Sequence, residues 1–444
     1  MEKEEKRAVQ ENGTEERSTE EKSPLKGKLQ YYSGEIQRDV TNLVKWLMLA
    51  VLVGGIVGVA STLFSFALKG VTNYRKENGW MFYLLPVMGL IIVFLYEKFG
   101  KEDGGTNQVL STVRSQDDVP ILSAPLIFIS TALTHLAGGS AGREGAAIQL
   151  GGSITNQLGR WIHLDEEDRH VIVMCGMSAA FSALFGTPMA AAVFALEVVS
   201  VGVMYYTALM PCMIASLIAS QFAAGMGVTP ESFHVVDIPA LSLETGLKMV
   251  IVAVGCAVVS IIFCMVLNAV AGLYAKWLKN PYIRVVVGAC LVIAVTLLLR
   301  TDEYMGSGAE LIAKAVETGQ TDTFAFLWKI ILTALTMRAG FRGGEIVPSF
   351  CVGATFGCVM GNLLGLSPSI CAACGMAAVF CGVTNCPITS ILIAFEMFGF
   401  RGVSFYLIAV SISYAASGYY GLYKNQTIVY SKYKAKYVNR HTRF

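Results

Sequence analysis

A glutamate in a glycine-rich loop is the residue of this sequence best placed to do chemistry. Glu144 lies in the run GGSAGREGAAIQ (138–149), between the apolar stretch 119–136 and a small-residue segment. Ionisable groups at membrane depth are costly and usually face a water-filled path or a partner. The glycines let the backbone turn sharply and present amides to an anion where a helix begins. The loop therefore predicts an anion site at Gly142, Arg143 and Gly145, with a carboxylate in its path.

Composition places the chain among membrane proteins. Of its 444 residues, 54% are hydrophobic and 15% are charged, and the mean hydropathy of +0.56 is too high for a soluble globule. The net charge is +2, and the aromatics of the apolar segments lack the interleaved basic residues that a nucleic-acid surface needs, so we expect no nucleic-acid partner. Most of the eleven cysteines lie in apolar segments and predict buried small side chains. No metal-ligand spacing occurs, so we expect neither a metal nor a cofactor.

The distribution of apolar segments divides the chain into three parts. Residues 1–40 are rich in Glu, Lys and Ser and predict a disordered arm. Residues 41–423 hold apolar segments, several of them interrupted by Gly or Pro and shorter than the roughly 20 residues of a simple span. Short broken helices of this kind are typical of an ion path through a lipid bilayer. A basic tail, 424–444, follows, and Lys and Arg at both ends predict cytoplasmic termini for a multi-pass protein of the cell membrane.

An internal repeat supports this interpretation. A shift of 199 residues lays Cys175-Gly176-Met177 on Cys374-Gly375-Met376, and it also superposes the pairs Arg143 and Arg342, Gly145 and Gly344, Pro188 and Pro387, and Glu197 and Glu396. Duplicated membrane chains are typical of transporters, whose sites lie where the halves meet. The repeats span about 41–224 and 242–423. Each half contributes a glycine-rich turn and the start of a helix, and opposed helix N-termini create a positive potential suited to a small anion.

These motifs resemble those of the ClC chloride channels and anion/proton antiporters. The run Gly142-Arg143-Glu144-Gly145 matches the family's GREG motif, the run 343–348 (GGEIVP) stands where the family has GGxFxP, and the run 104–107 (GGTN) stands where it has GSGIP. The resemblance covers roughly residues 41–430. It implies an all-α, inverted-repeat ClC-type fold with broken helices, and a homodimer with one anion path per subunit. It also implies that Glu144 is the gate that enters the anion path and carries the proton.

The departures from the motifs resemble the fluoride/proton antiporter branch of the family. Ala146 replaces the proline of GREGP, Ile346 replaces the phenylalanine of GGxFxP, and Val198 occupies the place of the internal glutamate of chloride antiporters. On this resemblance Glu345 is a candidate second proton carrier and Tyr423 is the inner-gate tyrosine. The same resemblance implies an anion site at Thr106 or Asn107, Gly142, Arg143, Gly145, Gly344, Ile346, Val347 and Tyr423.

Fluoride chemistry agrees with this assignment. Fluoride is small and strongly hydrated, so its site must replace lost water with hydrogen-bond donors such as the backbone amides of the glycine turns and the side chain of Thr106 or Asn107. A desolvated path favours the neutral form of a carboxylic acid, and protonation removes the charge that competes with the anion. We therefore expect a proton-coupled fluoride exporter that protects the cell from fluoride, with fluoride and protons as its partners and chloride as a further candidate.

Other interpretations stay open for several residues. Glu144 could simply pair with Arg143, and Glu345 could cap its helix. Glu197 and Glu396 are expected to cap or pair structurally. Thr106 and Asn107 could be turn residues, and Tyr423 could belong to an aromatic membrane belt.

Other functions also stay open. A chloride/proton exchanger or a passive chloride channel of the same fold would also fit. An intramembrane enzyme is disfavoured because neither a matched Ser/His or Cys/His pair nor an HExxH motif occurs.

Overall fold

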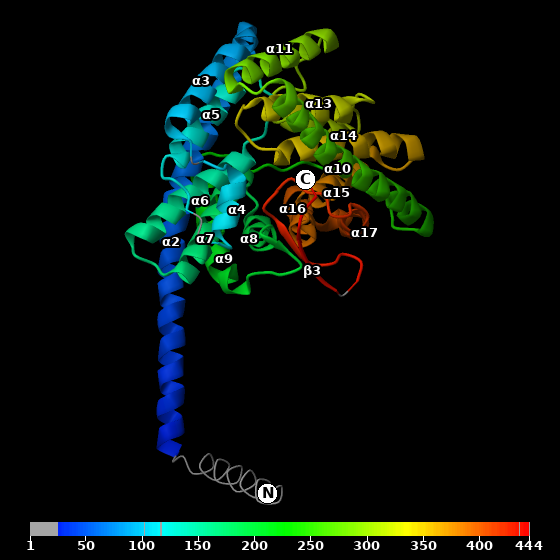
Figure 1. Ribbon diagram of the computed structural model, residues 1–444. Coiled ribbons are helices and arrows are strands. Elements are labelled where there is room, and N and C mark those ends of the chain that lie inside the picture. Colours follow the sequence, from blue (N-terminus) through cyan, green and yellow to red (C-terminus); the bar gives the residue numbers. More distant parts are fainter. Residues whose placement is uncertain (1–24, 102, 116–117, 435, 444) are drawn as a thin grey trace, which may run out of the picture. The chain divides into compact units, whose positions relative to one another are not determined.

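Helices dominate the structure. The computed structural model describes residues 25–101, 103–115, 118–434 and 436–443. The chain divides into two compact units, residues 1–49 and Ala50–Phe444. The second unit holds the end of the long helix α2 (Leu25–Glu77) and every later element (Figure 1).

Helix α2 corrects the prediction of a disordered arm over residues 1–40. It begins at Leu25, so residues 25–40 are helical, while residues 1–24 lie outside the described residues. Good helix formers such as Lys, Gln, Glu and Leu fill this stretch. Once the apolar part of α2 has formed, each further turn adds hydrogen bonds without a new nucleus. The polar composition of residues 25–40 is therefore compatible with a helix and does not imply disorder.

The two halves of the second unit repeat one order of elements. The first half comprises η1 (Gly79–Leu84), α3 (Leu85–Phe99), α4 (Thr106–Thr112), α5 (Ser123–Leu136), α6 (Glu144–Trp161), α7 (Glu166–Phe185), α8 (Pro188–Glu197), β1 (Ser200–Val201), η2 (Tyr206–Ala208) and α9 (Leu209–Gly225). The second comprises α10 (Leu243–Trp277), α11 (Pro281–Leu299), α12 (Ala309–Ala313), η3 (Lys314–Thr318), α13 (Ala325–Ala339), α14 (Ile346–Leu364), α15 (Pro368–Thr384), α16 (Pro387–Phe398), η4 (Phe400–Gly402) and α17 (Val403–Ala416). Thus α3 to α9 correspond to α11 to α17.

Local sequence explains where the short helices start and which of them form the core. Pro188 and Pro387, which the repeat superposes, each open a helix at a position where a missing N–H costs nothing. Residues 172–185 of α7 and 369–384 of α15 are all buried. A helix that is apolar on every side belongs inside a protein or a membrane bundle. These two helices therefore form the core against which the site-bearing helices α6 and α14 pack.

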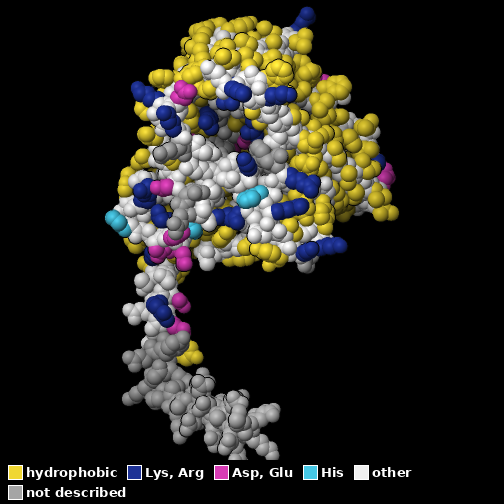
Figure 2. Space-filling model, in the orientation of Figure 1, with side chains coloured by type: hydrophobic (Ala, Val, Ile, Leu, Met, Phe, Trp, Pro, Cys, Tyr) yellow, Lys and Arg dark blue, Asp and Glu magenta, His cyan; other side chains and the backbone are white. Residues whose placement is uncertain are grey.

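The surface is apolar where a bilayer would contact it. Six helical segments of the described chain are long and apolar enough to span a membrane: Tyr32–Glu77, Gly79–Phe99, Tyr206–Gly225, Leu243–Trp277, Pro281–Leu299 and Ile346–Leu364. On α10 and α11, large hydrophobic side chains such as Leu243, Ile251 and Leu298 are exposed. Figure 2 shows hydrophobic side chains over this side of the unit, whereas Lys and Arg gather around a hollow. The short helices α5, α8, α15 and α16 agree with the prediction of broken segments.

The C-terminal tail folds into a small sheet that the sequence analysis did not predict. Strand β2 (Thr427–Tyr430) pairs in parallel with β1 and antiparallel with β3 (Tyr437–His441). Lys432 donates hydrogen bonds to the Tyr414 carbonyl oxygen and the Ser417 hydroxyl at the end of α17. Burial lowers the pKa of the Lys432 ammonium to about 8. The tail is thus fastened to the second unit.

Candidate functional site

The glycine-rich loops of the two halves bind each other. The Gly142 N–H donates to the Gly344 carbonyl oxygen at 2.7 Å, and the Gly344 N–H donates to the Gly142 carbonyl oxygen at 2.8 Å. A Cβ on Gly344 would lie 2.6 Å from the Gly145 nitrogen, so only glycine allows this approach. Helices α6 and α14 begin close to this bridge, at Glu144 and Ile346. The bridge therefore brings together the N-termini that the repeat had predicted to meet.

The bridge corrects one expectation about the anion donors. The amides of Gly142 and Gly344 are used by the bridge and are not available to an anion in this structure. The first N–H groups of a helix lack acceptors within that helix. In α14 these are the amides of Ile346 and Val347, since Pro348 has no N–H. The first turn of α14 thus leaves two donors for an anion.

Glu144 is buried beside its own neighbour. Its side chain is 1% exposed, and its carboxylate accepts hydrogen bonds from the Arg143 backbone N–H at 2.9 Å and from Arg143 Nε at 3.3 Å. The pairing with Arg143 that we left open is therefore present. Burial with a single cationic partner leaves the carboxylate sensitive to any change at that cation.

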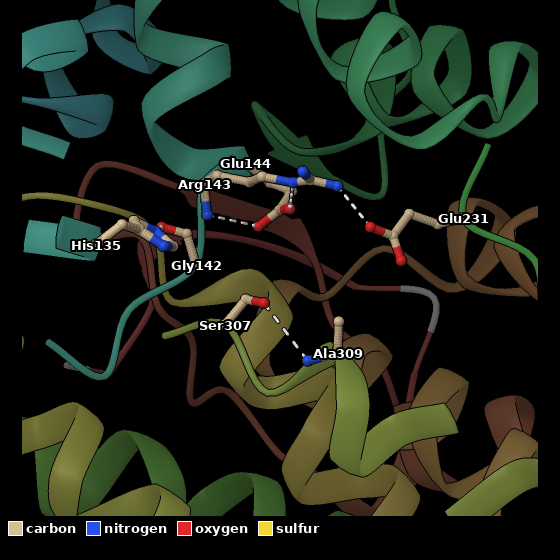
Figure 3. Close-up of polar contacts among 7 residues, drawn as sticks. All are labelled: His135, Gly142, Arg143, Glu144, Glu231, Ser307 and Ala309. Carbon is tan, nitrogen blue, oxygen red and sulfur yellow. Dashed lines mark hydrogen bonds and ion pairs between the residues drawn. The ribbon is translucent and has the colours of Figure 1, made fainter. Parts of the chain in front are cut away.

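Arg143 also binds a second carboxylate, that of Glu231. Its Nη2 donates to Glu231, so the guanidinium extends between two glutamates (Figure 3). A cavity of about 260 Å³ adjoins this cluster, and its lining includes Lys69, His135, Arg143, Glu231 and Ser307. The guanidinium next to Glu144 is therefore partly exposed and lines this cavity.

Glu345 lies at the start of α14, two residues after Gly343, which the repeat matches with Glu144. It is the N-cap residue, but its side chain makes no capping hydrogen bond. Instead it forms an ion pair with Arg338 at 3.3 Å, and its side chain remains 20% exposed. Capping alone therefore does not explain a glutamate at this position.

Thr106 and Asn107 begin helix α4 and have different contacts. The Thr106 hydroxyl donates to the Gly145 carbonyl oxygen at 3.2 Å, so it touches the first turn of α6. Asn107 instead binds Asn425: its side-chain oxygen accepts from the Asn425 N–H at 3.4 Å, and its carbonyl oxygen accepts from the Asn425 side chain at 3.1 Å. Of the two residues, Thr106 contacts the loop that carries Glu144.

Tyr423 lies inside the protein and not in an exposed aromatic belt. Its side chain is 4% exposed, and its buried hydroxyl has no hydrogen-bond partner among the described residues. Burial, and after it the negative charges of Glu345 and Glu144, raise the pKa of the Tyr423 phenol, so the hydroxyl keeps its proton. The tail holds its backbone, because the Thr442 hydroxyl donates to the Tyr423 carbonyl oxygen at 2.8 Å. A buried hydroxyl donor without a partner is suited to a passing anion.

Glu197 and Glu396 cap helices, as expected from the sequence. The Glu197 carboxylate accepts from the N–H groups of Ile388 and Thr389, in the first turn of α16. The Glu396 carboxylate accepts from the N–H groups at positions 189 and 190, in the first turn of α8. Two carboxylates that the repeat superposes thus fasten the two halves reciprocally.

Sequence reasoning missed three residues of this region. Glu231 lies in the linker between the halves and has no neighbouring motif. His135 is buried with its Nε2 3.4 Å from the Gly142 carbonyl oxygen. Lys329 is fully buried and donates to the carbonyl oxygens of Tyr304 and Gly306 at 2.9 and 2.7 Å. The apolar segment around Lys329 offered the one available signal, since a lone lysine there needs buried partners.

The fold and the site together define a helical membrane transport protein with two inverted repeats that meet at an ion path. The chain belongs to the ClC family, because the family model described as "Voltage gated chloride channel" matches residues 88–418. The resemblance drawn from the motifs is confirmed, and with it the inverted-repeat fold. The chain is accordingly an anion transporter of this family.

Named relatives and solved structures agree with this assignment. The "Chloride/fluoride channel protein" of Pseudomonas syringae pv. tomato is 34% identical over 88% of each chain. The "H(+)/Cl(-) exchange transporter ClcA" of Vibrio cholerae is 26% identical over 79% of this chain and 81% of its own. A crystal structure of a CLC-type fluoride/proton antiporter aligns with a TM-score of 0.83 and 32% identity, over 86% of this chain and 98% of that one. A slow cyanobacterial Cl−/H+ antiporter at 18% identity shares the fold, with a TM-score of 0.75, over 84% of this chain and 94% of that one.

Proposed function

We propose that this protein exports fluoride in exchange for protons and so protects the cell from fluoride. The observation that carries the proposal is a pair of carboxylates, Glu144 and Glu345, one at the start of each half-helix next to the Gly142–Gly344 bridge. Burial and, after it, their negative charges raise the pKa of the Tyr423 phenol, which keeps its proton as a donor. Two proton acceptors beside one anion path are what coupled exchange requires.

Glu144 is the gate and the first proton carrier in this proposal. As a carboxylate it stays paired with Arg143 and repels an incoming anion. As a neutral acid it loses that repulsion and much of its attraction to Arg143, so it can leave the path. Anion entry and proton uptake are thereby coupled through one side chain, which accounts for exchange without a further moving part.

The anion site is built from donors that the fold leaves free. The amides of Ile346 and Val347 and the Tyr423 hydroxyl can replace part of the hydration shell of fluoride, and the Thr106 hydroxyl can join them once it leaves the Gly145 carbonyl oxygen. Arg143 contributes charge, while Gly142, Gly145 and Gly344 allow the close approach of the two loops. Neutral dipoles bind an anion without holding it as tightly as a full positive charge would, which favours release.

Glu345 is the second proton carrier in this proposal. Val198 is buried and apolar where chloride exchangers of the family have an internal glutamate, so that route offers no carboxylate. Glu345 is partly exposed and paired with Arg338, which lets it exchange protons with water while staying near Tyr423. A proton path through Glu345 therefore suits this chain better than one through position 198.

The relatives support fluoride as the exported ion. A relative at 34% identity is named a chloride/fluoride channel protein, and a structure at 32% identity is that of a CLC-type fluoride/proton antiporter. Named H(+)/Cl(-) exchangers are more distant, at 26% identity and below. Chloride/proton exchange is the alternative, and the test must distinguish it from fluoride/proton exchange.

Location and assembly form part of the proposal. The spanning helices and the exposed apolar side chains of α10 and α11 suit a multi-pass protein of the cell membrane with cytoplasmic termini. The family resemblance implies a homodimer with one path per subunit. Sedimentation or light scattering in detergent tests the dimer, and labelling of single cysteines in cells tests the termini.

Liposome transport tests the function. The purified protein is reconstituted, and efflux of fluoride or chloride is recorded together with internal pH for wild type and Glu144→Gln. We expect fluoride efflux to drive protons inward and to exceed chloride efflux. Glu144→Gln should abolish proton movement, while Glu310→Gln, a change at an exposed glutamate paired with Lys76, should behave as wild type. Chloride efflux as fast as fluoride efflux, or efflux without protons in wild type, would sink the proposal.

A further inference from the structure

Arg143 is shared between two carboxylates of different origin. Its Nε lies 3.3 Å from Glu144 Oε1, and its Nη2 binds Glu231 at the other end of the guanidinium (Figure 3). Glu144 is 1% exposed, whereas the side chain of Glu231 is 24% exposed. The negative charge of Glu231 partly offsets the positive potential that Arg143 creates at Glu144. The strength with which Arg143 holds Glu144 therefore depends on Glu231.

Glu231 is held in place by both halves of the protein. It lies in the linker between α9 and α10, where its backbone N–H donates to the Phe185 carbonyl oxygen at the end of α7 at 2.9 Å. Two residues later the Phe233 N–H donates to the Met397 carbonyl oxygen of α16 at 3.0 Å. The linker is thus anchored on each side of the glutamate, and the carboxylate stays within reach of Arg143.

Other charged groups face the same cluster. The titratable and charged groups that line the adjoining cavity are Lys69 from α2, His135 from α5, and Arg143 and Glu231 themselves. Arg75 from α2 and Lys329 from α13 interact electrostatically with His135, and Tyr423 interacts with Glu144. Apart from Glu144, Glu231 is the one carboxylate among these groups. Removing its charge therefore leaves an excess of positive charge around Glu144.

We propose that Glu231 is a positioning residue for the gate: by binding the far end of Arg143 it weakens the hold of that cation on Glu144 and so allows Glu144 to accept a proton and leave the path. The inference rests on the proposed proton-coupled function. Without Glu231, Arg143 would pair with Glu144 alone, the carboxylate form would be favoured, and the gate would open only under more acidic conditions.

The pH dependence of transport tests this role. Fluoride efflux and proton uptake are measured in liposomes between pH 4 and 8 for wild type, Glu231→Gln, Glu231→Asp and the control Glu310→Gln. For Glu231→Gln we expect the pH of half-maximal rate to fall by about one unit, with a rate about 3- to 10-fold lower at neutral pH. Glu231→Asp keeps the charge and should restore most of the wild-type profile. Because Lys69 and His135 are unchanged in every variant, they contribute equally to all profiles.

Testing Glu231→Gln in the Glu144→Gln variant separates a positioning role of Glu231 from a purely structural one. In Glu144→Gln the gate has no charge for Arg143 to hold, so adding Glu231→Gln should leave the uncoupled anion leak unchanged within about twofold. A loss that persists in this background, or a slower rate with no change in pH profile, would overturn the inference in favour of a linker contact. If wild type moves no protons, the proposed function fails, and that outcome is visible without any Glu231 variant.

Discussion

Glu197 of α8 and Glu396 of α16 cap each other's helices. The Glu197 carboxylate accepts hydrogen bonds from the first turn of α16, and the Glu396 carboxylate accepts hydrogen bonds from the first turn of α8. Charge-assisted hydrogen bonds at a helix N-terminus satisfy amides that the helix itself leaves free. Because the repeat superposes the two glutamates, the same kind of helix-capping contact occurs twice and joins the two halves. This arrangement assigns both residues to stability and not to proton transfer.

Substitution of these glutamates should therefore lower stability without uncoupling transport. Glu197 accepts three hydrogen bonds, including one from the Thr389 hydroxyl at 2.6 Å, and Glu396 accepts two. We expect Glu197→Gln to cost about 1–3 kcal/mol and Glu396→Gln to cost less, because a neutral amide is the weaker acceptor. Thermal unfolding in detergent shows which of the two variants loses more stability. Loss of proton movement at unchanged stability would show that Glu197 carries protons after all.

Gly344→Ala should disrupt the bridge between the two loops. The added Cβ would meet the Gly145 nitrogen at 2.6 Å, and backbone on both sides cannot move away cheaply. We expect fluoride transport to fall at least about tenfold, since a displacement of the order of 1 Å at a site costs about that much or more. Gly55→Ala is the matched control, because a Cβ there has open space around it. Equal transport by both variants would contradict the role given to the bridge.

Glu345→Gln should impair proton movement more than stability. The substitution removes the ion pair with Arg338, which is partly exposed and contributes about 0–1 kcal/mol. If Glu345 carries the second proton, proton uptake during fluoride efflux should disappear while the unfolding temperature stays close to that of wild type. A variant that is destabilised but fully coupled would instead support a purely structural glutamate.

Thr106 and Asn107 can be told apart by their different contacts. Thr106→Val removes a hydroxyl beside the first turn of α6, so we expect weaker fluoride binding, by about tenfold, for the loss of one donor worth 1–1.5 kcal/mol. Asn107→Ala removes a side chain that binds Asn425 and should mainly loosen the C-terminal segment. Transport rates measured over a range of fluoride concentrations give the fluoride affinity of each variant, and thermal unfolding gives its stability. The opposite pattern would place Asn107 at the anion.

Much of the fold and part of the site could be predicted from the sequence. Glycine runs, short apolar segments and the 199-residue repeat are local or periodic signals, and they indicated broken helices, two halves and the meeting of their glycine turns. The extent of the N-terminal arm was misjudged because its composition suits both a solvated coil and the extension of an existing helix. The small C-terminal sheet was missed because its strands are short and because β1 pairs with β2, which lies far along the chain.

The sequence by itself determined which residue types stand at the starts of the two half-helices, because motif and repeat are properties of chain order. Only the tertiary structure decided how those residues are partnered. The amides of Gly142 and Gly344 bind each other, Glu345 pairs with Arg338, and Arg143 reaches Glu231 in the linker, 88 residues further along the chain. The physical reason is that hydrogen bonds and ion pairs depend on distances of a few ångströms between atoms, which the packing of the two halves sets and chain order does not.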